Sequence, residues 1–301
     1  MLVVGSTGVL GRALVMQLLA QGMAVRAMAR SPAKARDLAE LGAEVVPGDL
    51  RDPASLRRAC DGAGQVVAAA HALPGGHGNS SQTVDDAGHR ALIGSARDCG
   101  VSRFVYTSAQ GVSSSHPIDF FRTKHAVEEH LKASGVPWVI LRPSAFMEWH
   151  AHEFNGKSVL ARGKVTLLGP GTRRRNFVAA RDVAAVVVRV LSDASVVNRT
   201  IEIGGPDNLT DTEVAELYGR IAGVTPAISR VPVAVLRVMG ALLRPLAPGI
   251  SRIMRMAALL NSAPDETFDA SRLTAEFPIA LTSLEEFVRE KVGESRPTVR
   301  A

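Results

Sequence analysis

The first half of the chain alternates short apolar runs with amphipathic stretches. The runs, such as "LVV", "AVRAMA" and "QVVAAA", have the length and composition of buried strands, while the stretches between them repeat apolar residues at helical spacing. The predicted helices cover residues 9–21, 32–41, 53–60, 83–99 and 117–134. Strands that alternate with helices of this length form parallel βαβ units with right-handed crossovers. The pattern therefore predicts an α/β fold, a doubly wound parallel sheet with strand order 3-2-1-4-5-6.

The rhythm loosens after the sixth predicted strand. A further helix is expected near Ala180, and another begins at Thr210 or Asp211, with Glu213 in its first turn. From residue 225 to residue 263 the chain is helical, apolar and studded with arginine. The predicted organisation is a sheet core over residues 1–143, with the last sheet strand or strands and a small, mostly helical C-terminal lobe over residues 144–301, interleaved with the core in one compact unit.

Composition is that of an ordinary globular protein. Apolar residues make up 46% of the chain and charged residues 21%, which argues against disorder and fibrous architecture. The chain has a net charge of +6, but its arginines are dispersed, aromatic residues are only 4%, and no basic run is interleaved with stacking residues, so a single-stranded nucleic-acid groove is not expected. The start "MLVVGSTG" lacks a signal-peptide pattern, and no apolar run is long enough to span a membrane. Two cysteines, Cys60 and Cys99, are expected to be free thiols, which fits a cytoplasmic protein.

The segment "GSTGVLG" joins the first strand to the first helix. Its glycines, Gly5, Gly8 and Gly11, have the roles of a dinucleotide-binding turn: a tight bend, a close backbone approach to the pyrophosphate, and close helix–strand packing. The pyrophosphate would lie on the helix N-terminus, where N–H groups and the helix dipole favour an anion. The alternative is merely a tight turn. The position at the start of a βαβ series favours the nucleotide, with the loop residues Thr7, Val9 and Leu10 beside it.

The end of the second strand favours NADP over NAD. An acid at this place would bind the ribose 2′-hydroxyl of NAD, whereas arginine accommodates the 2′-phosphate of NADP. The sequence there reads "AMARSPAKA", with Arg30, Ser31 and Lys34 and no acid. A solvated cationic turn is the alternative. After the third strand, Asp49 and Leu50 of "GDLRDPASL" are expected at the adenine, and Asp52 is expected to cap the next helix ahead of Pro53.

These motifs resemble those of one superfamily. The segments "GSTGVLG", "GDLRD", "FVYTSAQG", "FFRTKHAVE", "ILRPSAFME" and "NFVAARDVA" are together similar to the atypical short-chain dehydrogenases/reductases, above all to the NmrA-like and complex-I-39-kDa-like branches. The resemblance covers roughly residues 1–222. It implies an NAD(P)-binding Rossmann core over residues 1–143, and a substrate lobe within residues 144–301.

The resemblance assigns roles to individual positions. Ser108 matches the active-site Ser or Thr. Lys124 matches the lysine that hydrogen-bonds the nicotinamide ribose and lowers the pKa of a neighbouring proton donor. Phe120 stands where the family has its proton-donating Tyr, which is a departure from the pattern. The remaining matches are Ala70 and Pro143 on the cofactor side, and Phe146 and Met147 at the substrate pocket.

Three groups could replace the missing Tyr. Lys124 could itself act once burial lowers its pKa, as the similar isoflavone-reductase-like branch implies. His71 or His116 could serve, because both follow strands at the edge where a doubly wound sheet binds ligands. Alternatively, there is no chemistry, and NADP occupancy acts as a signal. Tyr106 and Tyr218 are expected in the core.

Simpler interpretations stand beside several of these. Lys124 could be a solvated helix residue beside Glu128, and Ser108 could merely end its strand. The "RRR" at residues 173–175 is expected in a solvated charged turn, with attraction of an acidic substrate or cofactor phosphate as the alternative. The segment "HALPGGHGNSSQ" is a flexible loop or a lid. His150 and His152 in "EWHAHEF" invite a metal, but their spacing puts them on different helix faces, and we predict no metal.

The sequence thus favours an NADP-dependent oxidoreductase that reduces a small-molecule carbonyl, quinone or conjugated double bond. The alternative is a non-catalytic NADP(H) sensor or assembly protein. The Arg-spaced helices between Arg230 and Arg255 are expected to pack as part of the lobe, with peripheral contact to a membrane as the other interpretation. Substrate identity and oligomeric state are left open.

Overall fold

The computed structural model describes residues 1–72 and 80–295 of the chain, and its backbone forms two compact units. The first, here called the sheet unit, comprises residues Met1–Pro143 and Ala180–Ile203. The second, called the lobe unit, comprises Ser144–Ala179 and Gly204–Ala301. The chain therefore leaves the sheet unit, returns to it for one helix and one strand, and leaves it again. The predicted loop with Gly75, Gly76 and Gly78 lies outside the described residues.

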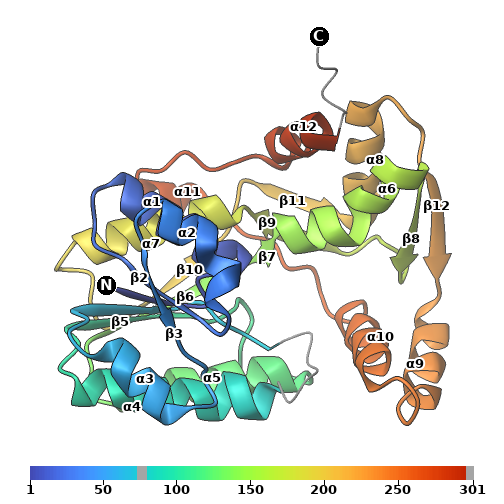
Figure 1. The fold of residues 1–301 in the computed structure, drawn as a ribbon. Helices are drawn as coiled ribbons and strands as arrows, with labels where there is room; N and C mark the ends of the chain where they lie inside the picture. The colour runs from blue at the N-terminus through green and yellow to red at the C-terminus, as the bar shows by residue number, and fades with distance from the viewer. Residues whose placement is uncertain (73–79, 296–301) are drawn as a thin grey trace. The chain divides into compact units, whose positions relative to one another are not determined.

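A seven-stranded parallel sheet forms the centre of the sheet unit (Figure 1). Its spatial order is β10-β6-β5-β4-β1-β2-β3, which confirms the predicted order 3-2-1-4-5-6 and adds β10 outside β6. Every residue of β5 is buried, as expected for a strand covered on both faces. The strands are β1 Leu2–Val4, β2 Arg26–Ala29, β3 Glu44–Pro47, β4 Gln65–Ala68, β5 Arg103–Thr107, β6 Trp138–Pro143 and β10 Arg199–Ile203.

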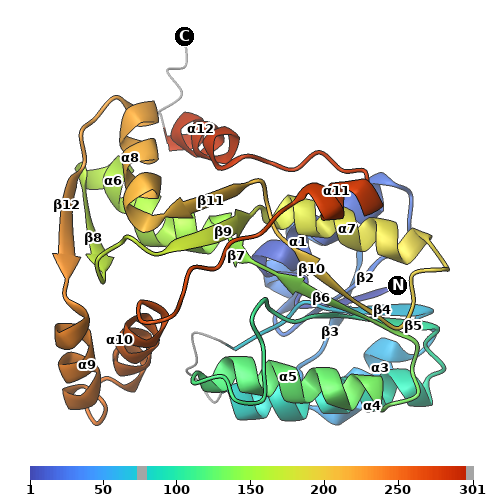
Figure 2. The same ribbon diagram turned by 180° about the vertical axis from the view of Figure 1, so that it is seen from behind.

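Helices cover both faces of this sheet (Figures 1 and 2). One face carries α1 Val9–Ala20, α2 Arg36–Glu40 and α7 Ala180–Ser192, and the other carries α3 Pro53–Cys60, α4 His89–Asp98 and α5 Asp119–Lys132. The helix predicted over 32–41 is split into a 3-10 turn, η1 Pro32–Ala35, and α2. The helix predicted over 83–99 begins instead as a π-helix, η2 Ser81–Gly88, that continues into α4.

Two predicted helix caps are confirmed. The Asp52 carboxylate accepts the Ala54 N–H at 3.1 Å, with Pro53 at the first helical position of α3. In the lobe unit, Thr210 caps α8, and the Glu213 carboxylate returns a bond to the Thr210 N–H at 2.8 Å.

The lobe unit is built from small sheets and helices. Its three-stranded sheet has the order β11-β9-β7, and β8 pairs with β12 in parallel. Its core includes Met147, Phe177 and Tyr218. None of the helices among the described residues could span a membrane. The elements are β7 Ala145–Phe146, η3 Met147–Gly156 (a π-helix), α6 Lys157–Arg162, β8 Lys164–Leu168, β9 Arg174–Val178, β11 Asp207–Thr210, α8 Asp211–Ala222, β12 Ala227–Val231, α9 Val233–Leu242, α10 Pro248–Leu260, α11 Ser271–Glu276 and α12 Leu284–Ser295.

Candidate active site

The glycine loop after β1 is shaped for close backbone contact. Gly5 has a φ of +86°, and a Cβ on it would lie 2.7 Å from the Ala70 backbone nitrogen. A Cβ on Gly11 would lie 2.1 Å from the Gly5 carbonyl oxygen, so α1 meets the loop where only glycine fits. Gly8 caps α1 without a side chain, and the first N–H groups of that helix have no intrahelical partner. The loop is thus a cradle for an anion, and it fits the pyrophosphate of a dinucleotide.

Cationic groups follow β2. Arg30 and Ser31 are exposed, and Ser31 directly precedes the 3-10 turn that contains Lys34. The nearest acid along the chain, Asp37, forms an ion pair with Arg12. Because its charge is already matched, Asp37 does not cancel the positive potential at the end of β2. The end of β2 therefore keeps the positive charge of Arg30 and Lys34.

The two residues predicted at the adenine are held by their own neighbours. Asp49 accepts the Arg51 backbone N–H at 2.9 Å and its guanidinium at 2.6 Å, and these bonds lower the pKa of the Asp49 carboxyl. Leu50 is buried, and a Cβ on Gly88 would lie 2.8 Å from the Leu50 Cβ. Asp49 thus stays an ionised acceptor, while Leu50 offers little free surface.

Two parallel neighbours, β4 and β5, bring the predicted polar residues to one edge of the sheet. Their register pairs Ala68 with Tyr106, so the residues that follow each strand emerge side by side. Ser108 comes directly after β5 and is 4% exposed. Its N–H donates to the Leu141 carbonyl at 2.7 Å, but its hydroxyl has no hydrogen-bond partner among the described residues. A buried hydroxyl without a partner is costly, and a ligand that accepts its hydrogen bond removes that cost.

Lys124, on α5, reaches this edge from the face of the sheet that carries α3, α4 and α5. Its side chain is buried, and its Nζ donates to the Thr107 carbonyl at 2.8 Å. The ammonium lies 4.9 Å from the centre of the Tyr106 ring and 5.3 Å from that of Phe120. Burial lowers the pKa of Lys124 from 10.5 to about 8, and the charges of Asp85 and Glu128 only partly oppose the shift. The interpretation as a solvated helix residue is therefore wrong.

The predicted pairing of Lys124 with Glu128 does not form either. Glu128 is fully buried and instead accepts two bonds from the Arg142 guanidinium, at 3.0 and 2.7 Å. Arg142 also contacts Glu202 at 3.1 Å, which ties α5 to β6 and β10. A bidentate pair of this kind fixes the orientation of α5. It leaves the Lys124 ammonium without a carboxylate in hydrogen-bond contact among the described residues.

Phe120 supplies a wall where the family has its Tyr. Its ring is buried and lies edge-on to His71, with 6.3 Å between ring centres. The pKa of His71 is lowered, by removal from water first and by the Lys124 charge second, so the imidazole is neutral at pH 7. The His71 side chain remains exposed, however, and water there weakens both effects. His116 accepts the Ile118 N–H through Nδ1 at 3.1 Å and stacks on Phe121.

Two buried polar residues of this site escaped the sequence analysis. Asp85 accepts the Ala72 N–H at 3.0 Å, and His89 lies edge-on to the Tyr106 ring, with 5.3 Å between ring centres. Burial lowers the pKa of His89 to about 3, and its Nε2 has no hydrogen-bond partner among the described residues. Asp85 and His89 are four positions apart, on the same stripe as the buried Val84 and Leu92. Their spacing from apolar core positions was the signal in the sequence that could have identified both residues as buried.

The remaining predicted site residues lie around the crossing into the lobe unit. Pro143 ends β6 and accepts the Gln110 N–H at 3.0 Å. Ser144 begins the lobe unit and donates to the Asn176 side-chain oxygen at 2.8 Å. Phe146 is half-buried, whereas Met147 is completely buried in the core of that unit. Of Phe146 and Met147, which were predicted at the substrate pocket with His71, His116 and Phe120, only Phe146 has exposed surface.

The histidines that suggested a metal have other partners. His150 is beside the Arg175 guanidinium at 3.4 Å, and burial followed by that positive charge lowers the pKa of His150 to about 3. His152 bonds the Tyr218 hydroxyl at 3.1 Å. Arg175 in turn pairs with Asp211. This network holds η3 against β9 and α8.

The arginine run at residues 173–175 is not a solvated turn. Arg173 pairs with Glu266 at 2.9 Å and Arg174 with Glu213 at 2.7 Å, while Arg175 pairs with Asp211. Two of the three arginines belong to β9, whose alternation points successive side chains to opposite faces. Each of these arginines is thus held in an ion pair within the lobe unit.

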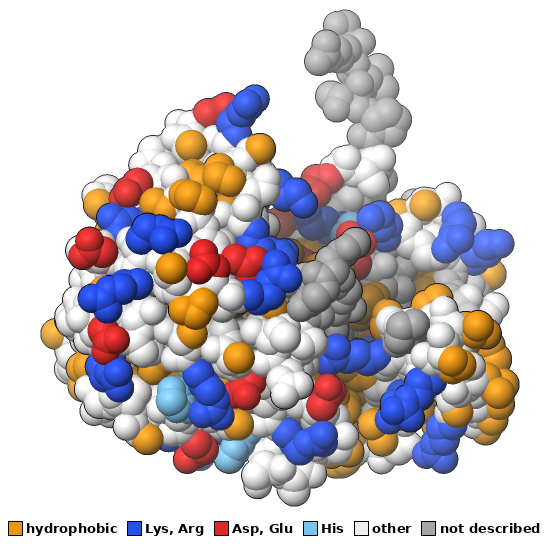
Figure 3. Space-filling view, turned by 60° about the horizontal axis from the view of Figure 1, so that its bottom comes forward, with side chains coloured by type: hydrophobic (Ala, Val, Ile, Leu, Met, Phe, Trp, Pro, Cys, Tyr) orange, Lys and Arg blue, Asp and Glu red, His pale blue; other side chains and the backbone are white. Residues whose placement is uncertain are grey.

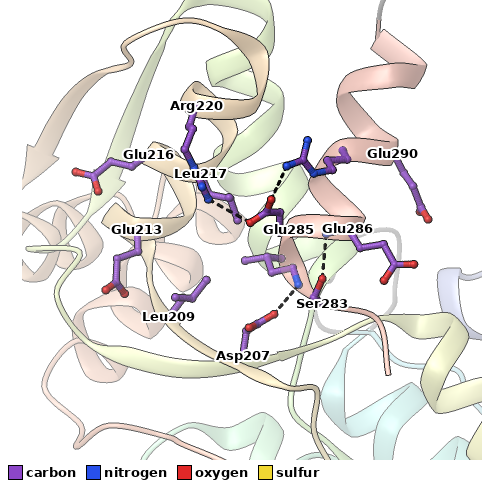
Figure 4. A pocket seen from close by; sticks show the side chains of 12 residues that line it. Asp207, Leu209, Glu213, Glu216, Leu217, Arg220, Ser283, Glu285, Glu286 and Glu290 are labelled. Carbon is purple, nitrogen blue, oxygen red and sulfur yellow. Dashed lines mark hydrogen bonds and ion pairs between the residues drawn. The ribbon is translucent and has the colours of Figure 1, made fainter. Parts of the chain in front are cut away.

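A separate hollow of about 960 Å³ opens in the lobe unit (Figure 4). Among its walls, Glu285 contacts Arg289 at 2.5 Å and Arg220 at 3.4 Å, and the Asp207 carboxylate accepts the Leu284 N–H at 2.6 Å. The surplus carboxylates in its lining repel a phosphate-bearing ligand. It contains none of the residues of the candidate active site. The lining residues are Asp207, Leu209, Glu213, Glu216, Leu217, Arg220, Ser283, Leu284, Glu285, Glu286, Arg289 and Glu290.

Comparison with known proteins agrees with the dinucleotide-binding glycine loop and the parallel sheet described above. The model of a protein family described as NAD(P)H-binding matches residues 5–194. The chain therefore belongs to this NAD(P)H-binding family, among the atypical short-chain dehydrogenases/reductases, as the motifs predicted. Its relatives in this oxidoreductase-like family include reductases as well as an assembly factor.

Three similar proteins illustrate that range. An NAD(P)H azoreductase of Xenophilus azovorans is 30% identical over 224 residues, which cover 74% of this chain and 73% of the relative. The photosystem II assembly factor Ycf39 of Trieres chinensis is 28% identical over 295 residues, or 96% of this chain and 92% of the relative. The structure of triphenylmethane reductase from Citrobacter sp., complexed with NADP(H), has a TM-score of 0.77 at 21% identity and covers 97% of this chain and 99% of that one. The last of these shows a shared fold.

Proposed function

We propose that this protein is an NADP-dependent oxidoreductase that reduces a carbonyl, a quinone or a conjugated double bond, and that Lys124 replaces the missing Tyr as proton donor. The observation that carries the proposal is the buried Lys124 ammonium at the carboxyl edge of the sheet, with its lowered pKa and its place beside the Ser108 end of β5. Active-site groups are where burial shifts pKa values toward the working pH.

Each residue has a defined task in this proposal. The cradle formed by Gly5, Gly8 and Gly11 holds the cofactor's pyrophosphate, and the bound cofactor supplies the hydride. As the substrate oxygen or carbanion gains negative charge, the Ser108 hydroxyl donates a hydrogen bond to it and Lys124 delivers the proton. Phe120 excludes water from the ammonium, which keeps the pKa of Lys124 low.

Lys124 is a better proton donor than either histidine. An acid must be protonated at the working pH, and Lys124 with a pKa of about 8 is mostly protonated at pH 7. The lowered pKa of His71 leaves that ring neutral. His116 uses Nδ1 to accept the Ile118 N–H at the start of α5, which is a structural task.

NADP is favoured over NAD by the charge at the end of β2. Arg30 is exposed there, its charge contributes to the lowered pKa of Asp49, and the acid that NAD would require is missing from "ARSPAKA". The fold relative from Citrobacter sp., which was crystallised with NADP(H), supports the same choice. The free thiols of Cys60 and Cys99 support a reducing compartment such as the cytoplasm.

The cofactor preference is tested by Arg30→Asp. The new carboxylate repels the 2′-phosphate and accepts the 2′-hydroxyl, so the Kd for NADPH should rise by about 10- to 100-fold while that for NADH falls. Fluorescence titration with both nucleotides measures this. Arg58→Asp makes the same change of net charge on the exposed surface of α3 and should leave both Kd values within about twofold. Equal losses in the two variants would contradict the role of Arg30.

The pH profile tests the protonation state of Lys124. Proton donation requires the ammonium form, which predominates below a pKa of about 8. We therefore expect kcat/KM to be level between about pH 6 and 8 and to fall by about tenfold per pH unit above it. A profile that instead falls below about pH 6.5, with no loss at higher pH, would assign the essential group to a deprotonated imidazole.

A non-catalytic NADP(H)-binding protein is the second candidate. It is favoured by the likeness to a photosystem II assembly factor over nearly the whole chain, and by the engagement of Lys124 Nζ with the Thr107 carbonyl. NADPH binding without consumption by any acceptor would support it.

A further inference from the structure

The α9–α10 hairpin, residues 233–260 of the lobe unit, exposes rows of apolar side chains. On α9, Val235, Val238, Met239 and Leu242 occupy positions i, i+3, i+4 and i+7, and all four are exposed. Such spacing places them on one helix face. Leu242 is 64% exposed, and Leu246 in the connection between the helices is 83% exposed.

The second helix repeats this pattern. Ile250 and Ile253 are exposed, and Met254 and Ala257 continue their row at i+4 and i+7. Hydrophobic side chains accordingly gather with arginines at the right of Figure 3, where Figure 1 places α9 and α10. The two helices pack on each other but leave these outer faces exposed. A soluble monomer rarely leaves so many large apolar residues together in water.

The inner face of the hairpin is closely packed. The Ser251 hydroxyl donates to the Gly240 carbonyl at 2.5 Å, and a Cβ on Gly240 would lie 2.8 Å from the Arg255 side chain. Leu236 and Ala258 are buried as well. Because small residues let the two helices approach each other, the hairpin presents its apolar rows on a fixed support.

The charge of the hairpin has a single sign. Between residues 225 and 264 the sequence has no Asp or Glu and five arginines, so this stretch contributes five of the chain's net charge of +6. Arg230 is engaged with the Pro170 carbonyl at 2.9 Å. Arg237 donates to the Ser262 hydroxyl at 3.1 Å, and together with Arg244, Arg252 and Arg255 it belongs to the helices and their connection.

We propose that the α9–α10 hairpin docks this protein on an anionic lipid membrane. Apolar rows beside a row of arginines, on helices of 10 and 13 residues, are the pattern of an interfacial helix that inserts its apolar side among the acyl chains and places its cations at the headgroups. The helices are too short to span the bilayer. The hairpin therefore lies on the membrane surface.

Charge favours a lipid surface over a second copy of the chain. A symmetric dimer through this face would bring two sets of arginines together, with no acidic residue of the same segment to offset them. The negative charges of anionic lipid headgroups, in contrast, would balance the positive charges of all these arginines. The continuous apolar rows require a partner that receives side chains along both helices, as acyl chains do.

The test is co-sedimentation of the full-length protein with vesicles. Binding is measured with vesicles of phosphatidylcholine and phosphatidylglycerol and with vesicles of phosphatidylcholine alone, at low salt and at about 0.5 M salt. The proposal predicts binding that requires phosphatidylglycerol and weakens at high salt. Since one arginine at an anionic surface is worth about a factor of five in affinity, Arg244→Ala with Arg255→Ala should weaken binding by about 25-fold.

The apolar contribution is tested separately with Leu242→Asp and Leu246→Asp together. Both leucines are exposed, so the fold should persist, as checked by circular dichroism, while vesicle binding is lost. Leu41→Asp changes an exposed leucine of the sheet unit and serves as the control, and Arg58→Ala with Arg97→Ala matches the arginine pair. These controls should bind vesicles like the unmodified protein.

Three results would overturn the proposal. One is no binding to either kind of vesicle, and another is equal binding to both at any salt concentration. The third is a monomer–dimer equilibrium by light scattering that the two leucine changes abolish, without vesicle binding, which would assign the face to a second copy. Because none of these measurements involves NADPH, their outcome is independent of the proposed reductase activity.

Discussion

Replacing Lys124 with Met is expected to abolish turnover while leaving the cofactor bound. Met keeps the length and bulk of the side chain but removes the proton that the reaction requires, so kcat should fall by about 10²- to 10⁴-fold. Stopped-flow measurement of NADPH oxidation gives kcat, and fluorescence titration gives the Kd for NADPH. We expect that Kd to change by less than about tenfold, because the pyrophosphate cradle belongs to a different part of the sheet unit.

The same substitution is expected to stabilise the fold at pH 7. The folded chain holds the pKa of Lys124 at about 8, below its ordinary 10.5, so burying the ammonium costs stability wherever it is protonated. Removing it should raise the free energy of unfolding by about 2 to 3 kcal/mol. Between pH 8 and 10.5 the unfolded chain binds more protons than the folded one, so the unmodified protein gains stability with pH and the difference shrinks.

The combined readout distinguishes catalysis from structure. If Lys124 merely supported the fold, its replacement would lower the free energy of unfolding and the activity of the protein together. A more stable variant without turnover is the signature of a buried catalytic charge. Lys132→Met, on the exposed part of the same helix, is the control. It should change neither kcat nor the free energy of unfolding by more than a small amount. Full turnover in Lys124→Met would remove this lysine from the mechanism.

Replacing Gly11 with Ala is expected to disrupt the nucleotide loop. The added Cβ would lie 2.1 Å from the Gly5 carbonyl oxygen and 2.9 Å from the Ser6 Cα, and these backbone atoms yield only if α1 shifts. We expect a loss of about 2 kcal/mol or more in the free energy of unfolding and a rise of at least about 100-fold in the Kd for NADPH. Thermal unfolding and fluorescence titration measure the two effects.

Two other glycines separate loop shape from nucleotide contact. A Cβ on Gly8 would meet only the Gly5 oxygen, at 3.3 Å, so Gly8→Ala should preserve stability yet weaken NADPH binding if the pyrophosphate lies against that residue. Gly94, on α4, has open space around its Cβ position, and Gly94→Ala should leave binding unchanged. NADPH binding at unmodified strength in both Gly8→Ala and Gly11→Ala would exclude the glycine loop as the cofactor site.

Local patterns in the sequence predicted the sheet and its caps correctly. The strand order follows from alternating apolar runs and helices, and the caps at Asp52 and Thr210 follow from side chains placed one residue before a helix. The strands, helices and caps depend on residues close together in the chain, and the strand order is the usual one for βαβ units with right-handed crossovers. Sequence periodicity is therefore enough to find them.

Features that depend on distant residues were not predicted. Lys124 follows a helical pattern compatible with exposure, and its burial results from the packing of Phe120 and Tyr106 around it. Arg174 pairs with Glu213 across many residues of sequence, so an apparent charged turn becomes part of a strand. Asp85 was missed because a polar residue at a core position contradicts the usual pattern.

The most direct test of the central proposal is the consumption of NADPH by the unmodified protein, followed as loss of nicotinamide absorbance with a panel of quinones, aldehydes and enones. We expect multiple turnovers with at least one of these acceptors, and faster turnover with NADPH than with NADH. Tight NADPH binding with no consumption by any acceptor would contradict it, and would identify a protein that binds the cofactor without using it for chemistry.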